Sequence, residues 1–176
     1  MPLCGVTGGS ASAVIKTSGG DGRAKLGDVI VSGTLRSLSA RTADLSGTLF
    51  SSDLLRAVQT AEHCAAATGL PVRTTAALRE QGYGVLEGRP SRELWDVVDW
   101  TDPLWAAEGG ESLAQLHGRV SALFAQLRAE PPAAVVALVT HGDTIRAAQA
   151  VAAGLGPDQL PAVTPHNGSV TRVDLP

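Results

Sequence analysis

The pattern of hydrophobic and polar positions divides the chain into short apolar runs that alternate with longer stretches of helical period. Alternation of this kind is typical of α/β domains. The stretch before His141 is the most continuous apolar run and is typical of a strand buried on both faces. We expect strands near residues 2–6, 47–51, 72–75, 134–140 and 168–173. This predicts a single α/β domain, a three-layer sandwich with a mainly parallel sheet and helices on both faces. The last strand can run antiparallel.

Helical periods flank these strands. Ser51-Ser52-Asp53 precedes an apolar run with steps of three and four residues, so we expect a helix to begin near Asp53, where side-chain oxygens accept the first N–H groups. Gly69-Leu70-Pro71 should end it. Similar periods predict helices over residues 34–45 and 111–129, and a further helix opens at Asp143.

Composition limits the function classes. The 176 residues, 44% of them hydrophobic, suit one domain with its own core. No apolar run approaches the roughly 18 residues of a membrane span, and the start lacks the basic residues of a signal peptide, so we expect a cytoplasmic protein. A net charge of −3 without a basic stripe argues against nucleic acid. Arginine outnumbers lysine twelve to two, which is typical of a GC-rich bacterial genome.

Cys4 and Cys64 are too few for a disulfide framework and lack metal-ligand spacing. We expect two buried thiols, no metal and no cofactor. The oligomeric state is left open by the sequence, and a homodimer is compatible with it.

Several short motifs follow one another in a distinctive order and spacing. Besides Ser51–Ala61 they are Leu78–Gly84, Glu87–Arg89, Gly109–Ser112, Val139–Arg146 and Asn167–Thr171. From Thr48 onward the chain resembles the histidine phosphatase superfamily, the phosphoglycerate-mutase-like proteins. The resemblance implies their fold, with an insertion at about residues 86–110 that lies over the active site and shapes substrate choice.

The N-terminal quarter departs from that family. Thr7-Gly8-Gly9-Ser10 follows the first predicted strand, a usual site of chemistry in a parallel sheet. A dinucleotide fingerprint is one interpretation, although Ser12 and Val14 stand where its later glycines would be. The other interpretation places the family's Arg-His-Gly motif in this loop.

In that second interpretation Val6, Thr7 and Gly8 stand at the three motif positions. The resemblance implies a histidine there that becomes a phosphohistidine and an arginine that holds the phosphoryl group. A threonine hydroxyl needs a base before it can attack, and a valine carries no charge. We therefore expect ordinary phosphate-ester turnover to be impaired.

Three polar residues remain in recognisable motifs. Arg56, in the first turn of a helix, can bind an anionic group, or it can form an ordinary surface ion pair. The resemblance assigns Glu80 as the proton donor to the leaving group; the alternative is a salt bridge to Arg79 or Arg89. His141 is the family's second histidine, and we expect it to face Arg56 and Glu80 across one pocket and to act with Glu80 as acid and base.

Other residues are candidates for substrate binding, each beside a plainer alternative. Arg23 can be a solvated loop residue, His166 a loop histidine without a role, and the three tryptophans a small local core; in the substrate-binding interpretation the indoles suit a ligand with an apolar or aromatic body. His117 is expected to be structural. The full set of candidates is Thr7, Gly8, Ser10, Arg23, Trp95, Trp100, Trp105 and His166.

Three classes of function remain open. The favoured one is an enzyme that uses acid–base chemistry without a phosphohistidine, by dehydration, isomerisation or hydrolysis of a small anionic metabolite. The second is a phosphatase with a replacement nucleophile such as His141, Thr7 or Ser10. The third is a non-catalytic binding protein.

Overall fold

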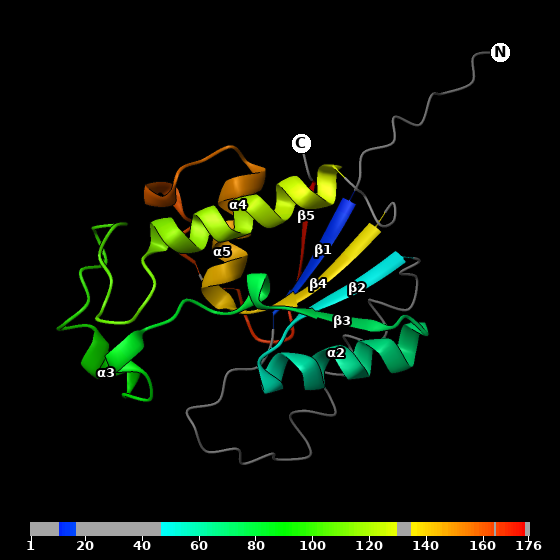
Figure 1. The fold of residues 1–176 in the computed structure, drawn as a ribbon, viewed down its shortest axis with the longest axis horizontal. Helices are drawn as coiled ribbons and strands as arrows, with labels where there is room; N and C mark the ends of the chain where they lie inside the picture. The colour runs from blue at the N-terminus through cyan, green and yellow to red at the C-terminus, as the bar shows by residue number, and fades with distance from the viewer. Residues whose placement is uncertain (1–10, 17–46, 130–134, 164, 175–176) are drawn as a thin grey trace.

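A five-stranded sheet forms the centre of the protein in the computed structural model, which describes residues 11–16, 47–129, 135–163 and 165–174 (Figure 1). The strand order is β3-β2-β4-β1-β5, and only β5 runs antiparallel, along β1. The strands are β1 (Ala11–Lys16), β2 (Gly47–Ser52), β3 (Val72–Thr75), β4 (Val135–Thr140) and β5 (Val170–Asp174). The single α/β domain with helices and a mainly parallel sheet is confirmed, and so is the antiparallel direction of the last strand.

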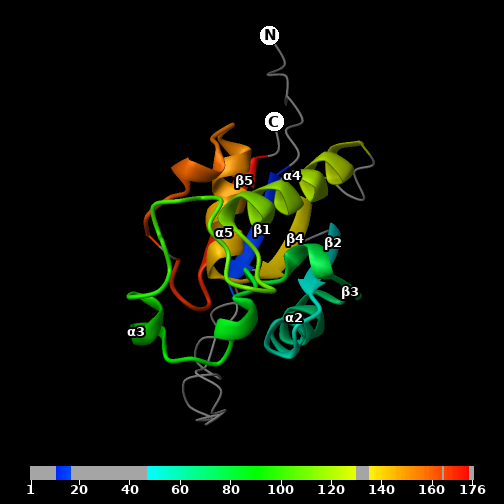
Figure 2. The ribbon, with the colours of Figure 1, turned by 60° about the vertical axis from the view of Figure 1, so that its left-hand side comes forward.

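Helices cover both faces of the sheet. Figures 1 and 2 show α2 on one side and α4 with α5 on the other. The helices are α2 (Leu55–Thr68), α3 (Ser91–Leu94), α4 (Leu113–Ala129) and α5 (Gly142–Ala152), with short 3-10 turns η1 (Ala76–Leu78), η2 (Gly84–Leu86) and η3 (Pro157–Gln159). None of the described helices is long and apolar enough to cross a membrane.

The central strand β4 contributes to two separate cores. Val136 and Leu138 pack in the cluster under α4 and α5, whereas Ala137 and Val139 pack in the cluster under α2. Because successive side chains of a strand point to opposite faces, an apolar residue at every position fills both layers. The prediction that this run is a strand buried on both faces is confirmed.

The register of the sheet brings the carboxyl ends of three neighbouring strands to one edge. Lys16 at the end of β1 lies opposite Thr140, and Ser51 near the end of β2 lies opposite Val139. The chain segments that follow β2 and β4 therefore leave at the same edge, the usual place for chemistry in a parallel sheet.

The first predicted strand, residues 2–6, lies outside the described residues. The first described strand is β1, which we did not predict from the sequence and which pairs with β4. Ser12 and Val14 pair with Val136 and Leu138 within this strand. They therefore belong to a strand and not to a glycine loop, which removes the dinucleotide interpretation. The helix predicted over residues 34–45 also lies outside the described residues.

The helix after β2 begins two residues later than expected. Its N-cap is Leu54, which offers no side-chain acceptor, and Ser52 Oγ accepts a hydrogen bond from the Leu54 N–H at 3.2 Å. Asp53 does not cap the helix, because its carboxylate binds Arg79. The predicted end is confirmed by Gly69, whose φ of 73° lies in the left-handed region favoured by glycine.

Backbone hydrogen bonds close the base of residues 86–110, which we call the cap, and we call this closed base the neck. The Glu111 N–H donates to the Gly82 carbonyl at 2.8 Å, and the Val85 N–H donates to the Glu108 carbonyl at 3.0 Å. Gly84 has a φ of 51°, and a Cβ there would lie 2.1 Å from the Glu108 carbonyl oxygen. The neck therefore requires glycine at this position, both for its conformation and for space.

This predicts that Gly84→Ala destabilises the protein more than Gly88→Ala does. Both glycines have positive φ, but a Cβ on Gly88 meets nothing within 4 Å. We expect Gly88→Ala to cost roughly 1 kcal/mol from backbone strain and Gly84→Ala to cost at least about 2 kcal/mol more from the clash. Urea unfolding measures both. Equal costs would contradict a neck closed by direct backbone contact.

Candidate active site

Two threonines hold the segment after η1 against the end of β4 and the start of α5. The buried Thr140 hydroxyl donates to the Leu78 carbonyl at 2.7 Å, and the Thr144 hydroxyl donates to the Arg79 carbonyl at 2.7 Å. These bonds join residues more than sixty positions apart in the sequence. They place the next residue, Glu80, at the first turn of α5.

The Glu80 carboxylate covers the N-terminus of α5. It accepts hydrogen bonds from the backbone N–H groups of Gly142 at 3.0 Å, Asp143 at 3.1 Å and Thr144 at 3.4 Å. His141 holds the N-cap position but makes no side-chain capping bond. A residue distant in sequence therefore supplies the acceptor that the first N–H groups of a helix need.

Glu80 is poised to exchange a proton near neutral pH. Burial raises its pKa from the ordinary 4.5 to about 7, and the negative charge of Asp143 acts in the same direction. The backbone N–H groups of Gln81, Thr144 and Asp143 favour the carboxylate form but do not outweigh these two effects. A carboxyl group with a pKa near 7 can act as a general acid at physiological pH.

Asp143 links Glu80 to two further side chains. Its carboxylate pairs with Arg146 at 2.8 Å, and Arg146 also donates to the Pro161 carbonyl. Burial raises the pKa of Tyr83, and the charges of Asp143 and Glu80 raise it further. The Tyr83 phenol therefore stays neutral beside these carboxyl groups.

His141 lies directly after β4 and is buried, with an exposure of 2%. Its neighbour Gly142 donates to Glu80, so the glutamate carboxyl group binds the backbone of the residue that follows the histidine. Hydrogen bonds from Arg79 lower the pKa of Asp53, and His141 contributes a smaller lowering. This electrostatic interaction joins the end of β2 to the same site.

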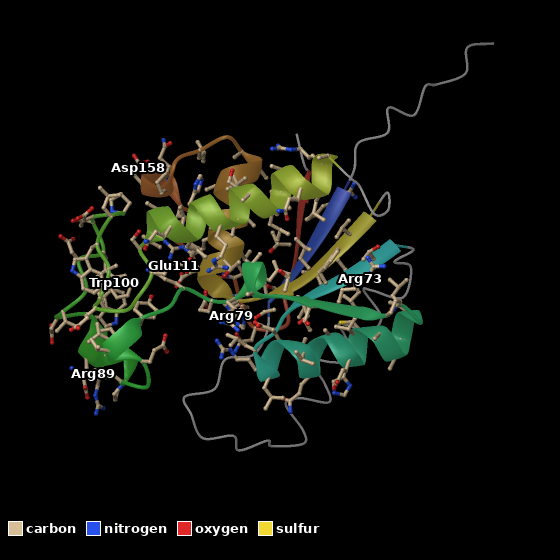
Figure 3. All side chains as sticks on the ribbon, viewed as in Figure 1. Arg73, Arg79, Arg89, Trp100, Glu111 and Asp158 are labelled. Carbon is tan, nitrogen blue, oxygen red and sulfur yellow. The ribbon has the colours of Figure 1, made fainter. Side chains whose placement is uncertain are left out.

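Arg79 forms a bidentate pair with Asp53, at 2.7 and 2.6 Å, beside the start of α2 (Figure 3). The alternative of a Glu80–Arg79 salt bridge was therefore wrong, because Arg79 has a different partner. Arg56 is exposed in the first turn of α2. The part of the chain that the structure describes shows no ion pair for Arg56, so its predicted anion contact stays a prediction.

Two of the three tryptophans lie on the surface of the cap. Trp95 is 68% exposed and Trp100 is 41% exposed, and their ring centroids lie 5.2 Å apart. Trp105 is half-buried. The first two indoles therefore do not form a small local core, whereas their role in substrate binding stays a prediction.

The remaining candidates are less informative. His166 is exposed in the turn before β5, and the His117 ring contacts the Leu155 carbonyl at 2.9 Å, in keeping with a structural role. Thr7, Gly8, Ser10 and Arg23 lie outside the described residues. Among the residues that are described, no group of three His, Cys, Asp or Glu side chains could hold a metal ion.

The sequence interpretation missed one side chain that supports the site. Arg119 on α4 pairs with Glu111 through two bonds of 2.9 and 2.7 Å, and it also donates to the Ala77 and Arg79 carbonyls. It therefore ties the neck of the cap to the segment that carries Glu80. Only the eight-residue spacing of Glu111 and Arg119 hints at this pair, and nothing in the sequence points to the carbonyl contacts.

This sheet order, with a histidine after the central strand and a glutamate over the next helix, defines a phosphoglycerate-mutase-like α/β protein. The family model of the histidine phosphatase superfamily (branch 1) matches residues 34–176, and the chain belongs to this family.

Relatives and solved structures agree with this placement. A probable phosphoglycerate mutase of Yersinia enterocolitica is 34% identical over 134 residues, which are 72% of this chain and 62% of that protein. The chain thus spans less than two thirds of the curated relatives it matches. A mycobacterial glucosyl-3-phosphoglycerate phosphatase is 28% identical with a TM-score of 0.72, covering 92% of this chain and 88% of that one.

The fold alone also matches an alpha-ribazole phosphatase of Shigella flexneri, with a TM-score of 0.73, 19% identity and coverage of 92% and 89%. These relatives are named as phosphatases and a mutase. Members of the family are enzymes, so the enzyme expectation is supported. The preference for dehydration or isomerisation over phosphate-ester chemistry receives no support.

The pKa of Glu80 predicts a pH-dependent stability. Between pH 4.5 and about 7 the unfolded chain has released the Glu80 proton while the folded chain retains it. The folded state binds more protons in this window, so the free energy of unfolding falls as pH rises through it, by up to roughly 3 kcal/mol. Glu80→Gln should remove this decline. Denaturant unfolding across the window tests it, and parallel pH curves for both proteins would contradict it.

Removing the two threonine hydroxyls should have different consequences. Thr140→Val and Thr144→Val each lose one hydrogen bond to a backbone carbonyl, at about 1–2 kcal/mol of stability. Only Thr144 also lies beside the Glu80 carboxyl group, with Oγ1 at 3.5 Å from Oε1. We therefore expect Thr144→Val to shift the Glu80 pKa in a carboxyl NMR titration, and Thr140→Val to leave it in place. The reverse pattern would contradict this geometry.

Proposed function

We propose that the protein hydrolyses a phosphate monoester of a small molecule, with Glu80 as the proton donor to the leaving oxygen. The observation that supports this most is the position of Glu80, at the first turn of α5 beside His141, with a pKa of about 7. An alkoxide is a poor leaving group and departs readily only when it receives a proton. A bound phosphate dianion would raise the Glu80 pKa further, so the acid would keep its proton in the complex.

The attacking group in this proposal is a water molecule activated by His141. The chain has no histidine before His63, so the segment between β1 and β2 contains no imidazole. The histidines other than His141 are less suited, because His63 and His166 are exposed and His117 contacts a carbonyl. His141 directly follows the central strand, and the next residue, Gly142, donates to Glu80.

His141 and Glu80 account for both proton transfers in the proposed hydrolysis. The water oxygen bonds to phosphorus while His141 takes a proton from it. The bond between phosphorus and the ester oxygen breaks, and Glu80 protonates that oxygen. The products are inorganic phosphate and an alcohol. Arg56, exposed in the first turn of α2, is assigned to the phosphoryl oxygens, because a guanidinium at a helix N-terminus suits an anion.

Substrates that differ only in leaving group test the role of Glu80. Glu80→Gln should lower kcat for an alkyl phosphate by about 10²–10⁴ but change kcat for p-nitrophenyl phosphate far less, because nitrophenolate needs no proton to leave. For the alkyl phosphate, wild-type kcat/KM, which reports the free enzyme, should fall as pH rises through about 7. Glu62→Gln, an exposed carboxyl on α2, serves as the control and should change neither rate. Equal losses on the two substrates would refute Glu80 as the acid.

Phosphoenzyme trapping tests the attacking group. The proposal predicts that His141→Ala abolishes phosphate release from both substrates and that no acid-labile phosphoenzyme forms during turnover. A phosphorylated histidine would contradict activation of water and would assign His141 as a nucleophile. Absence of any phosphate release would favour a non-catalytic protein that binds phosphate esters.

A further inference from the structure

The guanidinium group of Arg119 divides its nitrogen atoms between two targets. Its Nε and Nη2 donate to the Glu111 carboxylate at 2.9 and 2.7 Å. Its Nη1 donates to the backbone carbonyls of Ala77 at 2.8 Å and Arg79 at 3.1 Å. The side chains of this ion pair are only 22% and 21% exposed. A rigid planar fork can serve two targets in fixed directions, which the single ammonium nitrogen of a lysine does less well.

Glu111 also binds the segment that carries Glu80, through its backbone. The side-chain amide of Gln81 donates to the Glu111 carbonyl at 2.8 Å, and the Glu111 N–H donates to the Gly82 carbonyl at 2.8 Å. Gln81 is buried, and its own backbone N–H donates to the Glu80 carboxyl group at 3.2 Å. The residue before Glu80 is therefore held by Arg119, and the two residues after it are held by Glu111.

The proton affinity of Glu80 depends on where its carboxyl group lies. Burial is the main cause of its pKa of about 7, and the charge of Asp143 acts in the same direction. A carboxyl group that regained contact with water would return towards the ordinary pKa of 4.5. The two threonine hydroxyls bind only carbonyls that precede Glu80, so they do not replace the contacts that Glu111 makes after it.

We propose that Arg119 is a positioning residue for the reaction, which fixes the Glu80 carboxyl group at the point where the leaving oxygen receives its proton. The proposal rests on the proposed function, since that function makes Glu80 the proton donor. Arg119 acts through the backbone, because it binds the carbonyl of the preceding residue, Arg79, and the carboxylate of Glu111. A general acid must lie within hydrogen-bond distance of the oxygen that it protonates, and a displacement of about 1 Å can lower the rate about 100-fold.

Two leaving groups separate positioning from a general loss of structure. Arg119→Met keeps the apolar part of the side chain and removes its hydrogen bonds. It should lower kcat for an alkyl phosphate about 100-fold and change kcat for p-nitrophenyl phosphate far less, because nitrophenolate needs no proton to leave. Arg128→Met is the matched control, since Arg128 is exposed in the last turn of the same helix, and it should change neither rate. Equal losses on the two esters would overturn the proposal.

Combined and conservative variants test whether Arg119 acts through Glu80. Added to Glu80→Gln, Arg119→Met should cause no further loss on the alkyl phosphate, because the acid is already absent. A further loss as large as that in the wild type would overturn the proposal. Arg119→Lys keeps the charge but not the fork, so its rate on the alkyl phosphate should stay well below that of the wild type. Full activity of Arg119→Lys would refute the division of the guanidinium between two targets.

A carboxyl NMR titration of Glu80 tests the positioning without any substrate. In Arg119→Met the midpoint should fall from about 7 towards 4.5, whereas Arg128→Met should keep it. Glu111→Gln, a milder change that leaves the backbone contacts in place, should lower the midpoint by less and serves if Arg119→Met does not fold. An unchanged midpoint in these folded variants would overturn the proposal. If the midpoint falls while the wild type hydrolyses neither ester, the positioning of Glu80 stands and the proposed function fails.

Discussion

The contact between the Glu80 carboxyl group and the first N–H groups of α5 is the interaction on which the site depends. A helix N-terminus attracts negative charge, which favours the carboxylate, while burial and the neighbouring Asp143 favour the protonated acid. Burial and Asp143 outweigh the helix amide groups, so the pKa of Glu80 rises from the ordinary 4.5 to about 7. The Glu80 carboxyl group therefore caps α5, directly after His141, and can hold a proton near neutral pH.

The rest of the fold holds that contact in place. The register of β4 with β1 and β2 brings the strand ends to one edge. Thr140 at the end of β4 and Thr144 in α5 bind the segment before Glu80 through its carbonyl groups. Arg119 on α4 binds the same segment. Arg119 also binds Glu111 at the neck, so the same side chain contacts both the base of the cap and the segment that carries Glu80.

The parts of the structure that local pattern determines were predictable from the sequence. Short stretches of residues were enough to predict the strand β4 and the glycine that ends α2. Short motifs were also enough to single out Glu80 and His141. Strand β1 was not predicted because its apolar run is short, and its pairing with β4 joins residues far apart in the sequence. The helix start near Asp53 was misjudged for a similar reason, since its carboxylate is used by Arg79, 26 residues later. Contacts between distant side chains and carbonyls leave no local pattern.

Proton donation by Glu80 requires that it hold its proton near neutral pH while it covers the N-terminus of α5. The most direct test is a ¹³C NMR titration of the Glu80 carboxyl carbon in the free protein, assigned by comparison with Glu80→Gln. We predict a midpoint at about pH 7. A midpoint near the ordinary 4.5 would show that the amide groups of the helix keep Glu80 ionised, and would contradict its role as the acid.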